Sequence, residues 1–462
     1  MKCLIIAAGK GKRLSKMGKP KPLVNLLGLT LIERVILTAR KSGITDFYVV
    51  TGYNGGKVRK FLDKFGQAKN IKITHIINEE WEMENGLSVL KAKGLLNENF
   101  FLLMGDHLFD ENILIKMRDV HIPDGEVILA TDYNISSNRL VDIKDVTKIF
   151  VENGKIIDIG KSIKNYNAYD TGIFLCSPAI FEAIEESIIY HNESTLSTSI
   201  KLMAKQGKVK SFDIKDAFWI DVDDEKTFKK AKRCLIDKLK KPSDGPISRH
   251  INRRFSVKIT QYLLKTNITP NQISLFSFIL CLIASLFFFL GSYIGLAIGA
   301  VLAQISSIID GCDGEVARLK HMESDFGRWF DAVLDRYADA FLLAGLTWYV
   351  YSLSRNFLPL FVGFLAITGT FLNSYTADKY DGLMREKLRG YYFRIGRDIR
   401  IFIIFLGALI NQPFLTLLLI ASLMNAENIK RIVVLYKVSV QRLAISDKNE
   451  SPPFIKKLKA EH

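Results

Sequence analysis

The sequence predicts a doubly wound α/β domain followed by an all-α polytopic membrane domain of six transmembrane helices. Residues 1 to about 240 are rich in charge and alternate apolar runs of strand length with helical patterns. This alternation is typical of a mostly parallel sheet covered by helices. From about residue 270 to 436, apolar runs long enough to span a bilayer dominate.

The composition limits the kinds of function. Five cysteines are scattered and form no C-x-x-C pair, so we expect reduced thiols and neither a disulfide framework nor a zinc site. The net charge of +16 comes without a recognition-helix pattern or an aromatic-studded basic strand, so we expect no nucleic acid. Anionic lipid headgroups and phosphorylated substrates explain the positive charge better. The first apolar run is too short for a signal peptide, which predicts a cytoplasmic first half.

Each element of the first half follows from its local pattern. Continuous apolar runs predict buried strands at 3–8, 46–51, 71–77, 100–104 and 126–131. Helical periodicity between the early strands predicts helices at 29–42, 57–65 and 86–95. The later elements are predicted strands at 146–151, 155–159 and 208–213 and a closing helix at 225–240. We place the first domain at 1–232 and a turn-rich linker at 233–248.

The second half begins with basic and apolar side chains interleaved over 249–267. This pattern predicts an amphipathic helix lying in the membrane interface, with an ordinary surface helix as the alternative. The membrane domain is placed at 268–440 and a charged tail at 441–462. Its predicted spans are 272–291, 293–317, 327–352, 357–378, 398–411 and 413–436.

Charge in the connecting segments sets the expected orientation. Basic side chains concentrate in 379–400 and in the C-terminal tail, whereas the opposite turns carry almost no charge. The positive-inside bias then predicts a multi-pass protein of the cell membrane, in contact with membrane lipids, whose first domain and C-terminus are cytoplasmic. The last two spans could form one helix kinked near Pro413, but this would export the basic tail, so six spans are favoured.

The first predicted strand ends in a glycine loop, A-A-G-K-G-K-R-L at 7–14, and P-K-P-L follows around Lys21. Gly9 and Gly11 would let backbone amides reach the oxygens of a triphosphate, and Arg13 and Lys21 would offset its charge. An ordinary strand–helix turn is the alternative.

This loop, together with P-K-P-L, resembles the sugar-phosphate nucleotidyltransferases. The resemblance covers about residues 1–232 and implies catalytic roles for Arg13 and Lys21. The residues that it assigns to the nucleotide are Ala8, Gly9, Gly11, Lys21 and Asn85. It places the acceptor pocket around 51–53 and 170–172.

Two aspartates complete this resemblance. Asp106 follows an apolar strand in L-L-M-G-D-H, and Asp221 lies in W-I-D-V-D-D. The resemblance implies that both bind a metal ion, Mg²⁺ or alternatively Mn²⁺, with Asp223 competing for the role of Asp221. An acidic cluster at a helix N-terminus is the other interpretation of Asp221.

The most informative run is D-G-C-D-G-E-V-A-R at 310–318, followed by Gly327 and two further aspartates. Asp310 and Asp313 share one helix face, and Asp331 and Asp335 share another. Two such faces brought together would make an all-oxygen cage for one or two hard divalent cations. A solvated acidic hinge between two membrane helices is the alternative.

This run resembles, position for position, the signature of the CDP-alcohol phosphotransferases. The resemblance implies that Asp310, Asp313 and Asp331 hold Mg²⁺ or Mn²⁺ and that Asp335 completes the metal site and acts as base. It also implies a nucleotide-binding face. The residues of that face are Gly311, Gly314, Ala317 and Arg318, where the small ones leave room for a pyrophosphate.

Both domains on one chain resemble the bifunctional inositol-1-phosphate cytidylyltransferase/di-inositol-phosphate phosphate synthases of hyperthermophiles. The resemblance implies that CTP and inositol 1-phosphate give CDP-inositol, which then condenses with a second inositol 1-phosphate. It also implies a homodimer through the membrane domain. Lys379, Arg389 and Arg397 are candidates for the acceptor phosphate, although positive-inside bias alone would explain them.

Two rival functions remain open from sequence alone. One is a phospholipid synthase that uses a CDP-diacylglycerol donor, with the first domain serving another pathway. The other is a non-catalytic receptor or scaffold that senses nucleotides. The complete sets of aspartates in both halves count against the second.

Overall fold

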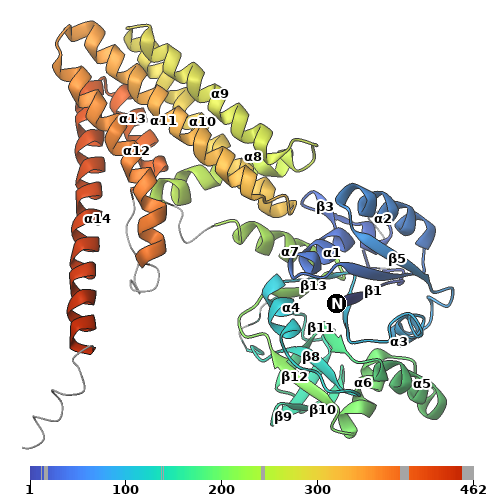
Figure 1. Cartoon of the computed structure of the whole chain (residues 1–462). Helices are drawn as coiled ribbons and strands as arrows, with labels where there is room; N and C mark the ends of the chain where they lie inside the picture. Colours follow the sequence, from blue (N-terminus) through green and yellow to red (C-terminus); the bar gives the residue numbers. More distant parts are fainter. Residues whose placement is uncertain are drawn as a thin grey trace, which may run out of the picture. The chain divides into compact units, whose positions relative to one another are not determined.

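The computed structural model describes residues 1–11, 13–14, 19–136, 138, 140–240, 245–384 and 395–449. The chain divides into two compact units, Met1–Lys238 and Leu239–His462. The first unit is an α/β domain and the second is helical (Figure 1).

A nine-stranded sheet forms the centre of the first unit. Its strand order is β5-β4-β1-β6-β11-β8-β12-β10-β9. The four strands at one end, which pair in parallel, are β5 (Lys72–Ile77), β4 (Asp46–Thr51), β1 (Lys2–Ala7) and β6 (Phe100–Met104). The other five strands are β11 (Ala168–Cys176), β8 (Val127–Asp132), β12 (Val209–Asp213), β10 (Lys155–Gly160) and β9 (Lys148–Glu152).

The prediction of a mostly parallel sheet is wrong beyond these first four strands. β11, which is absent from the predicted elements, runs antiparallel to both β6 and β8, and β9 and β10 form an antiparallel pair. Only β8 and β12 pair in parallel in this half. Antiparallel strands need no crossover helix, and the described residues between β8 and β11 form two short strands and no helix.

Helices cover both faces of the sheet. The helices on one face, which pack with Ile5 and Leu103, are α1 (Leu31–Lys41), α2 (Gly55–Lys69) and α4 (Glu111–Arg118). Those on the other face, which pack with Leu4 and Leu102, are α3 (Asn85–Leu90), α5 (Ala179–His191) and α6 (Leu196–Lys205). Successive strand residues point to opposite faces, so the continuous apolar runs of β1 and β6 supply both cores. Neither α5 nor α6 is among the predicted elements.

A separate two-stranded sheet joins distant parts of this unit. β7 (His107–Phe109) pairs antiparallel with β13 (Trp219–Asp221), which sets Asp221 opposite His107. The remaining elements of the unit are η2 (Lys21–Leu23), β2 (Asn25–Leu26), β3 (Leu29–Thr30) and α7 (Glu225–Asp237).

The described part of the second unit is entirely helical. Its elements are η3 (Ser248–Asn252), α8 (Arg253–Leu263), α9 (Pro270–Phe289), α10 (Tyr293–Leu319), α11 (Asp325–Ser354), α12 (Leu358–Met384), α13 (Arg397–Leu409) and α14 (Pro413–Asn449). Apolar side chains from α9 to α14 meet in one buried core. The α9 helix begins with a capping box between Thr269 and Gln272, with a proline at its first position.

Three helices in the described residues are long and apolar enough to cross a membrane: Pro270–Phe289, Tyr293–Leu319 and Leu358–Ala377. The predicted fifth and sixth spans are separate helices, because the chain turns at Asn411, whose φ is 53°, before Pro413 starts α14. The described α13 has 13 residues, which rise about 20 Å against a hydrocarbon core of about 30 Å. The described helix and the predicted fifth span, 398–411, are therefore both shorter than the hydrocarbon core.

Candidate active sites

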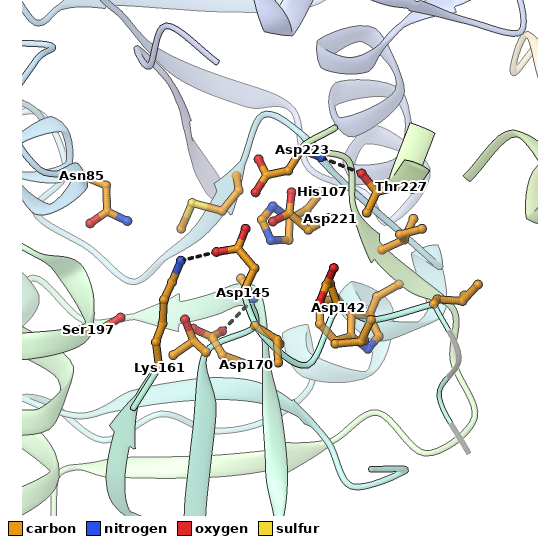
Figure 2. Close-up of a pocket in the computed structure, with 18 of the residues that line it drawn as sticks. Asn85, His107, Asp142, Asp145, Lys161, Asp170, Ser197, Asp221, Asp223 and Thr227 are labelled. Carbon is orange, nitrogen blue, oxygen red and sulfur yellow. Dashed lines mark hydrogen bonds and ion pairs between the residues drawn. The ribbon is translucent and has the colours of Figure 1, made fainter. Parts of the chain in front are cut away.

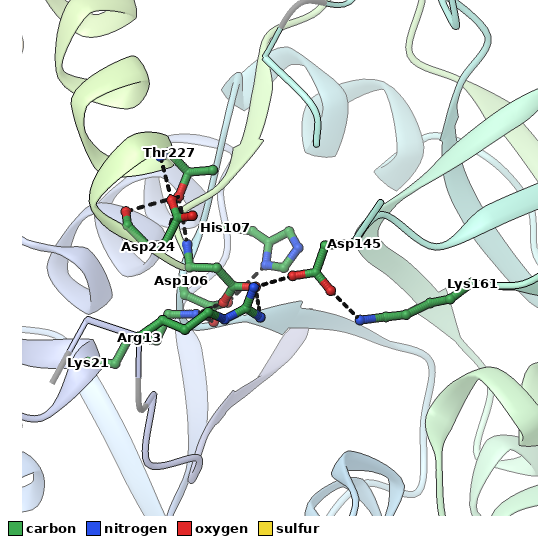
Figure 3. Close-up of polar contacts among 9 residues, drawn as sticks. Arg13, Lys21, Asp106, His107, Asp145, Lys161, Asp224 and Thr227 are labelled. Carbon is green, nitrogen blue, oxygen red and sulfur yellow. Dashed lines mark hydrogen bonds and ion pairs between the residues drawn. The ribbon is translucent and has the colours of Figure 1, made fainter. Parts of the chain in front are cut away.

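The glycine loop of the first unit leads to a buried lysine. Gly11 has a φ of 59°, and a side chain there would meet the stem of Lys21, so backbone and packing both favour glycine. Ala8 is buried, and a side chain on Gly9 would meet open space. Lys21 is 7% exposed, and its Nζ lies 2.5 Å from Asp106 Oδ2 (Figure 3). The structure thus brings the loop, the lysine and the first aspartate together.

Three side chains of this site could hold a metal ion. One ligand atom each of Asp106, His107 and Asp221 lies within 4.8 Å of the others. Asp221 Oδ1 is buried and accepts no hydrogen bond from the described residues. The alternative ligand, Asp223, contacts Lys21 and accepts from Arg13 Nη2 at 3.0 Å. A hard divalent cation would satisfy the unpartnered carboxylate oxygen, so the donor set fits such an ion.

The electrostatics of the cluster differ from residue to residue. Burial raises the pKa of Asp221 to about 7, although His107 opposes the shift. Burial would lower the pKa of His107, but the carboxylates of Asp221 and Asp106 outweigh it and raise that pKa to about 9. Burial would raise the pKa of Asp106, but Lys21 and His107 hold it well below its usual range. Asp106 is therefore held in its ionised form, whereas the charged form of Asp221 beside it would be stabilised by a bound cation.

A second group of charged side chains spans the site, and no sequence pattern indicated it. Asp145 accepts hydrogen bonds from Arg13 and, at 2.8 Å, from Lys161 Nζ (Figure 3). These two cations hold the pKa of Asp145 down at about 2, with Lys161 contributing most. Lys161 directly follows β10, but a lone lysine after a strand carries no sequence signal. Only the fold brings Lys161 and Arg13 to the same carboxylate, that of Asp145.

These residues line a cavity of about 230 Å³ in the first unit (Figure 2). Asn85 borders it from α3, and its Oδ1 accepts from the backbone N–H of Leu196 at 2.9 Å. Asp170 borders it from β11, where burial raises its pKa to about 6. The structure therefore places the predicted nucleotide contact and part of the predicted acceptor region around one cavity that also includes Asp221.

The second unit gathers the four aspartates of the predicted cage. Asp310 and Asp313 come from α10, and Asp331 and Asp335 from α11. One carboxylate oxygen each of Asp310, Asp313 and Asp331 lies within 4.8 Å of the others. Such an all-oxygen donor set suits a hard divalent cation. Asp335 Oδ1 instead lies 2.5 Å from Arg397 Nη1.

Arg397 stands at the start of α13 and reaches three carboxylates. Its guanidinium lies 2.8 Å from Asp310 and 3.3 Å from Asp339 as well as against Asp335. Asp339, one turn beyond Asp335 and 5% exposed, is also bonded to Arg400 at 2.5 Å. No sequence pattern indicates this buried pair of Asp339 and Arg400, because the two residues lie about sixty positions apart along the chain.

Two serines of α9 donate hydrogen bonds to carboxylates of this candidate metal site. Ser274 Oγ donates to Asp313 Oδ2 at 2.5 Å, and Ser277 Oγ donates to Asp310 Oδ1 at 2.9 Å. Both hydroxyls are buried, and their i, i+3 spacing matches that of the two aspartates. Hydrogen bonds of this kind hold ligands in position and tune a metal site.

The other predicted residues of this unit are less directly placed. The missing side chain of Gly311 points towards Arg253 and Ser256 of α8, and that of Gly314 points towards its own helix neighbour, Arg318. Ala317 is half-buried on the same helix. Lys379 lies in α12 with its side chain outside the described part, and Arg389 falls outside the described residues altogether.

The folds and clusters define the class: a nucleotidyltransferase-type α/β unit joined to a helical unit of the CDP-alcohol phosphotransferase type. The family model described as MobA-like NTP transferase domain matches residues 3–160. The model described as CDP-alcohol phosphatidyltransferase matches residues 267–438. Both parts therefore belong to transferase families.

Whole-length relatives make the assignment narrower. The chain is 33% identical to the bifunctional IPC transferase and DIPP synthase of Rubrobacter xylanophilus, over 93% of this chain and 95% of that one. It is 32% identical to the protein of the same description from Aquifex aeolicus, over 94% and 98%. The inositol-1-phosphate CTP transferase structure from T. maritima is 25% identical, with a TM-score of 0.45, and covers 50% of this chain and 93% of that one. The chain belongs to the family of bifunctional IPC transferases and DIPP synthases.

Proposed function

We propose that the chain catalyses two successive reactions. The first unit converts CTP and inositol 1-phosphate to CDP-inositol and diphosphate. The second unit transfers phosphoinositol from CDP-inositol to another inositol 1-phosphate, which yields di-inositol phosphate phosphate and CMP. The observation that carries the proposal is a family match that extends over both units, with a carboxylate cluster and cationic partners in each.

In the first reaction, a phosphate oxygen of inositol 1-phosphate attacks the α-phosphorus of CTP. The new P–O bond replaces the bond to the β-phosphate, and diphosphate leaves. The attacking oxygen is already anionic, so the residues have to position and screen rather than remove a proton. Arg13 and Lys21 offset the triphosphate charge, and Lys161 binds the acceptor phosphate from across the cavity. A divalent cation bound by Asp106 and Asp221, for which we propose Mg²⁺ or Mn²⁺, would screen the remaining charge.

In the second reaction, a neutral hydroxyl of the acceptor attacks the β-phosphorus of CDP-inositol and CMP leaves. Asp335 accepts the hydroxyl proton as general base. Arg397, already in contact with Asp335, would bind the acceptor phosphate together with Lys379 and Arg389. A divalent cation held by the other three aspartates would offset charge on the diphosphate.

For the placement in the membrane, we propose six spans formed by α9 to α14, with α8 in the cytoplasmic interface. On α8, Phe255 and Tyr262 are exposed beside basic side chains, as an interfacial helix requires. The first unit and the C-terminus would then be cytoplasmic, and the membrane unit would form a homodimer. We place the domains at 1–232 and 268–440, joined by the linker and the interfacial helix.

The proposal is tested by separating the units. A chain truncated after Lys238 keeps both cores and the whole of α7, so we expect it to fold alone and to release diphosphate from CTP with inositol 1-phosphate. Products are identified by ³¹P NMR. The same chain with Asp106→Ala should be inactive, because one metal ligand is lost. A folded truncated chain that binds no CTP would refute the first half of the proposal.

The acceptor role of Lys161 gives a further prediction. Lys161→Ala should raise the KM for inositol 1-phosphate in the first reaction at least about tenfold, since a hydrogen bond to a charged group contributes about 1.5–3 kcal/mol. The KM for CTP should change far less. The matched control is Lys155→Ala, which alters an exposed lysine at the start of β10, the strand that Lys161 follows. An equal rise in both KM values would show that Lys161 does not distinguish the acceptor.

A further inference from the structure

The α10 helix carries a fully buried glutamate immediately beside the metal-site aspartates. Glu315 is 0% exposed and follows Asp313 by two residues. Residues two apart on a helix point to nearly opposite sides, so Glu315 faces away from the carboxylate cluster. A buried carboxylate is costly unless it is fully hydrogen-bonded, and no proposed step of either reaction uses this one.

Among the described residues, the donors of hydrogen bonds to Glu315 all lie on α8. Oε1 accepts from Arg253 Nη1 at 2.5 Å and from Ser256 Oγ at 2.6 Å, and Oε2 accepts from Thr260 Oγ1 at 2.7 Å. The three donors are buried, and their spacing places them on one face of α8. Both carboxylate oxygens are therefore bonded to a single neighbouring helix.

The contact between α8 and this turn of α10 extends beyond the carboxylate. Cys312 Sγ lies 3.5 Å from the carbonyl oxygen of Ser256, and a side chain on Gly311 would lie 3.7 Å from Arg253. On its other side, the same turn is bonded through Asp313 to Ser274 of α9. The turn that bears the metal-site aspartates is therefore bonded on both sides.

We propose that Glu315 is a positioning residue of the transferase site, which acts by fixing the rotation of this turn so that Asp310 and Asp313 converge on the metal ion. The inference rests on the proposed second reaction. With the α8 contact weakened, α10 can rotate or shift by a fraction of a turn, and the two carboxylates no longer meet Asp331 at bonding distance. Partners that only orient metal ligands typically change metal affinity about 10–100-fold when removed.

The test measures metal binding as well as turnover in the full-length protein. Asp106→Asn is introduced throughout to weaken the metal site of the first unit, and Mn²⁺ binding is followed by electron paramagnetic resonance. Glu315→Gln should weaken Mn²⁺ binding at least about tenfold. In the chain with an intact first unit, it should raise the Mg²⁺ concentration for half-maximal CMP release, while CDP-inositol synthesis stays near wild type.

The matched control is Glu427→Gln, which alters another buried glutamate of the same unit, bonded to Arg431 on α14. It should not change Mn²⁺ affinity, even if both variants lower the melting temperature equally. Should Glu315→Gln fail to fold, Thr260→Val removes one donor and keeps the other two, and a smaller loss of Mn²⁺ affinity is expected.

Unchanged Mn²⁺ affinity in a folded Glu315 or Thr260 variant would overturn the positioning role and leave Glu315 with packing alone. A different result would show instead that the proposed second reaction is wrong. In that case the chain with Glu315 intact would neither bind Mn²⁺ at the Asp310 cluster nor release CMP from CDP-inositol.

Discussion

Asp335→Asn is expected to lower the rate of CMP release from CDP-inositol about 10²–10⁴-fold, the contribution typical of a general base. Asparagine keeps the size of the side chain but cannot take the proton of the attacking hydroxyl. CDP-inositol synthesis from CTP should stay near wild type, because its carboxylates lie in the other compact unit. Supplying CDP-inositol and inositol 1-phosphate directly, and following CMP, isolates the second reaction.

The matched control for this variant is Asp325→Asn at the exposed start of the same helix, which should leave both reactions unchanged. Loss of both activities in the Asp335 variant would indicate misfolding or one shared site. Normal CMP release would remove Asp335 as the base.

Lys21→Met should lower kcat of the first reaction about 10²–10³-fold, as expected when one preorganised group that stabilises transition-state charge is removed. Methionine fills the space of the lysine stem but leaves Asp106 and Asp223 without their shared cation. CMP release from supplied CDP-inositol should be unaffected. Diphosphate release, measured with saturating CTP and inositol 1-phosphate, gives the change in kcat.

Lys19 provides the control, since Lys19→Met removes the same charge from an exposed position two residues earlier. A melting temperature near wild type is required of both variants. If Lys21→Met raises only the KM for CTP, the lysine contributes to binding alone and its catalytic role is wrong.

Much of the first site was predicted by the resemblance to the nucleotidyltransferases, which assigned the glycine loop and Asp106 to one site. The structure supplies the physical reason, because the loop and Asp106 follow the parallel neighbours β1 and β6. The second cluster was predictable, since helical periodicity alone puts Asp310 beside Asp313 and Asp331 beside Asp335. A local pattern was sufficient for these two aspartate pairs, because the members of each pair lie on one helix.

Other parts of the sites could not be predicted, because their partners lie far apart in sequence. Arg13 and Lys161 meet around Asp145 only after the second half of the sheet folds against the first. Ser274 and Ser277 have no pattern that separates them from other small residues of an apolar helix. Their roles depend on which turn of α10 packs against α9. The sequence of one helix alone does not determine the packing angle and register of the pair.

The sequence by itself determined two units of different class, the strands and helices with strong periodicity, and the pairs of aspartates that share one helix face. The tertiary structure decided the antiparallel insertion of β11 between β6 and β8, and it decided the partners of Glu315 and Arg397. The physical reason is that periodicity reports only whether a face is buried. What a buried charge meets there depends on contacts between distant helices, and these form only when the whole unit folds.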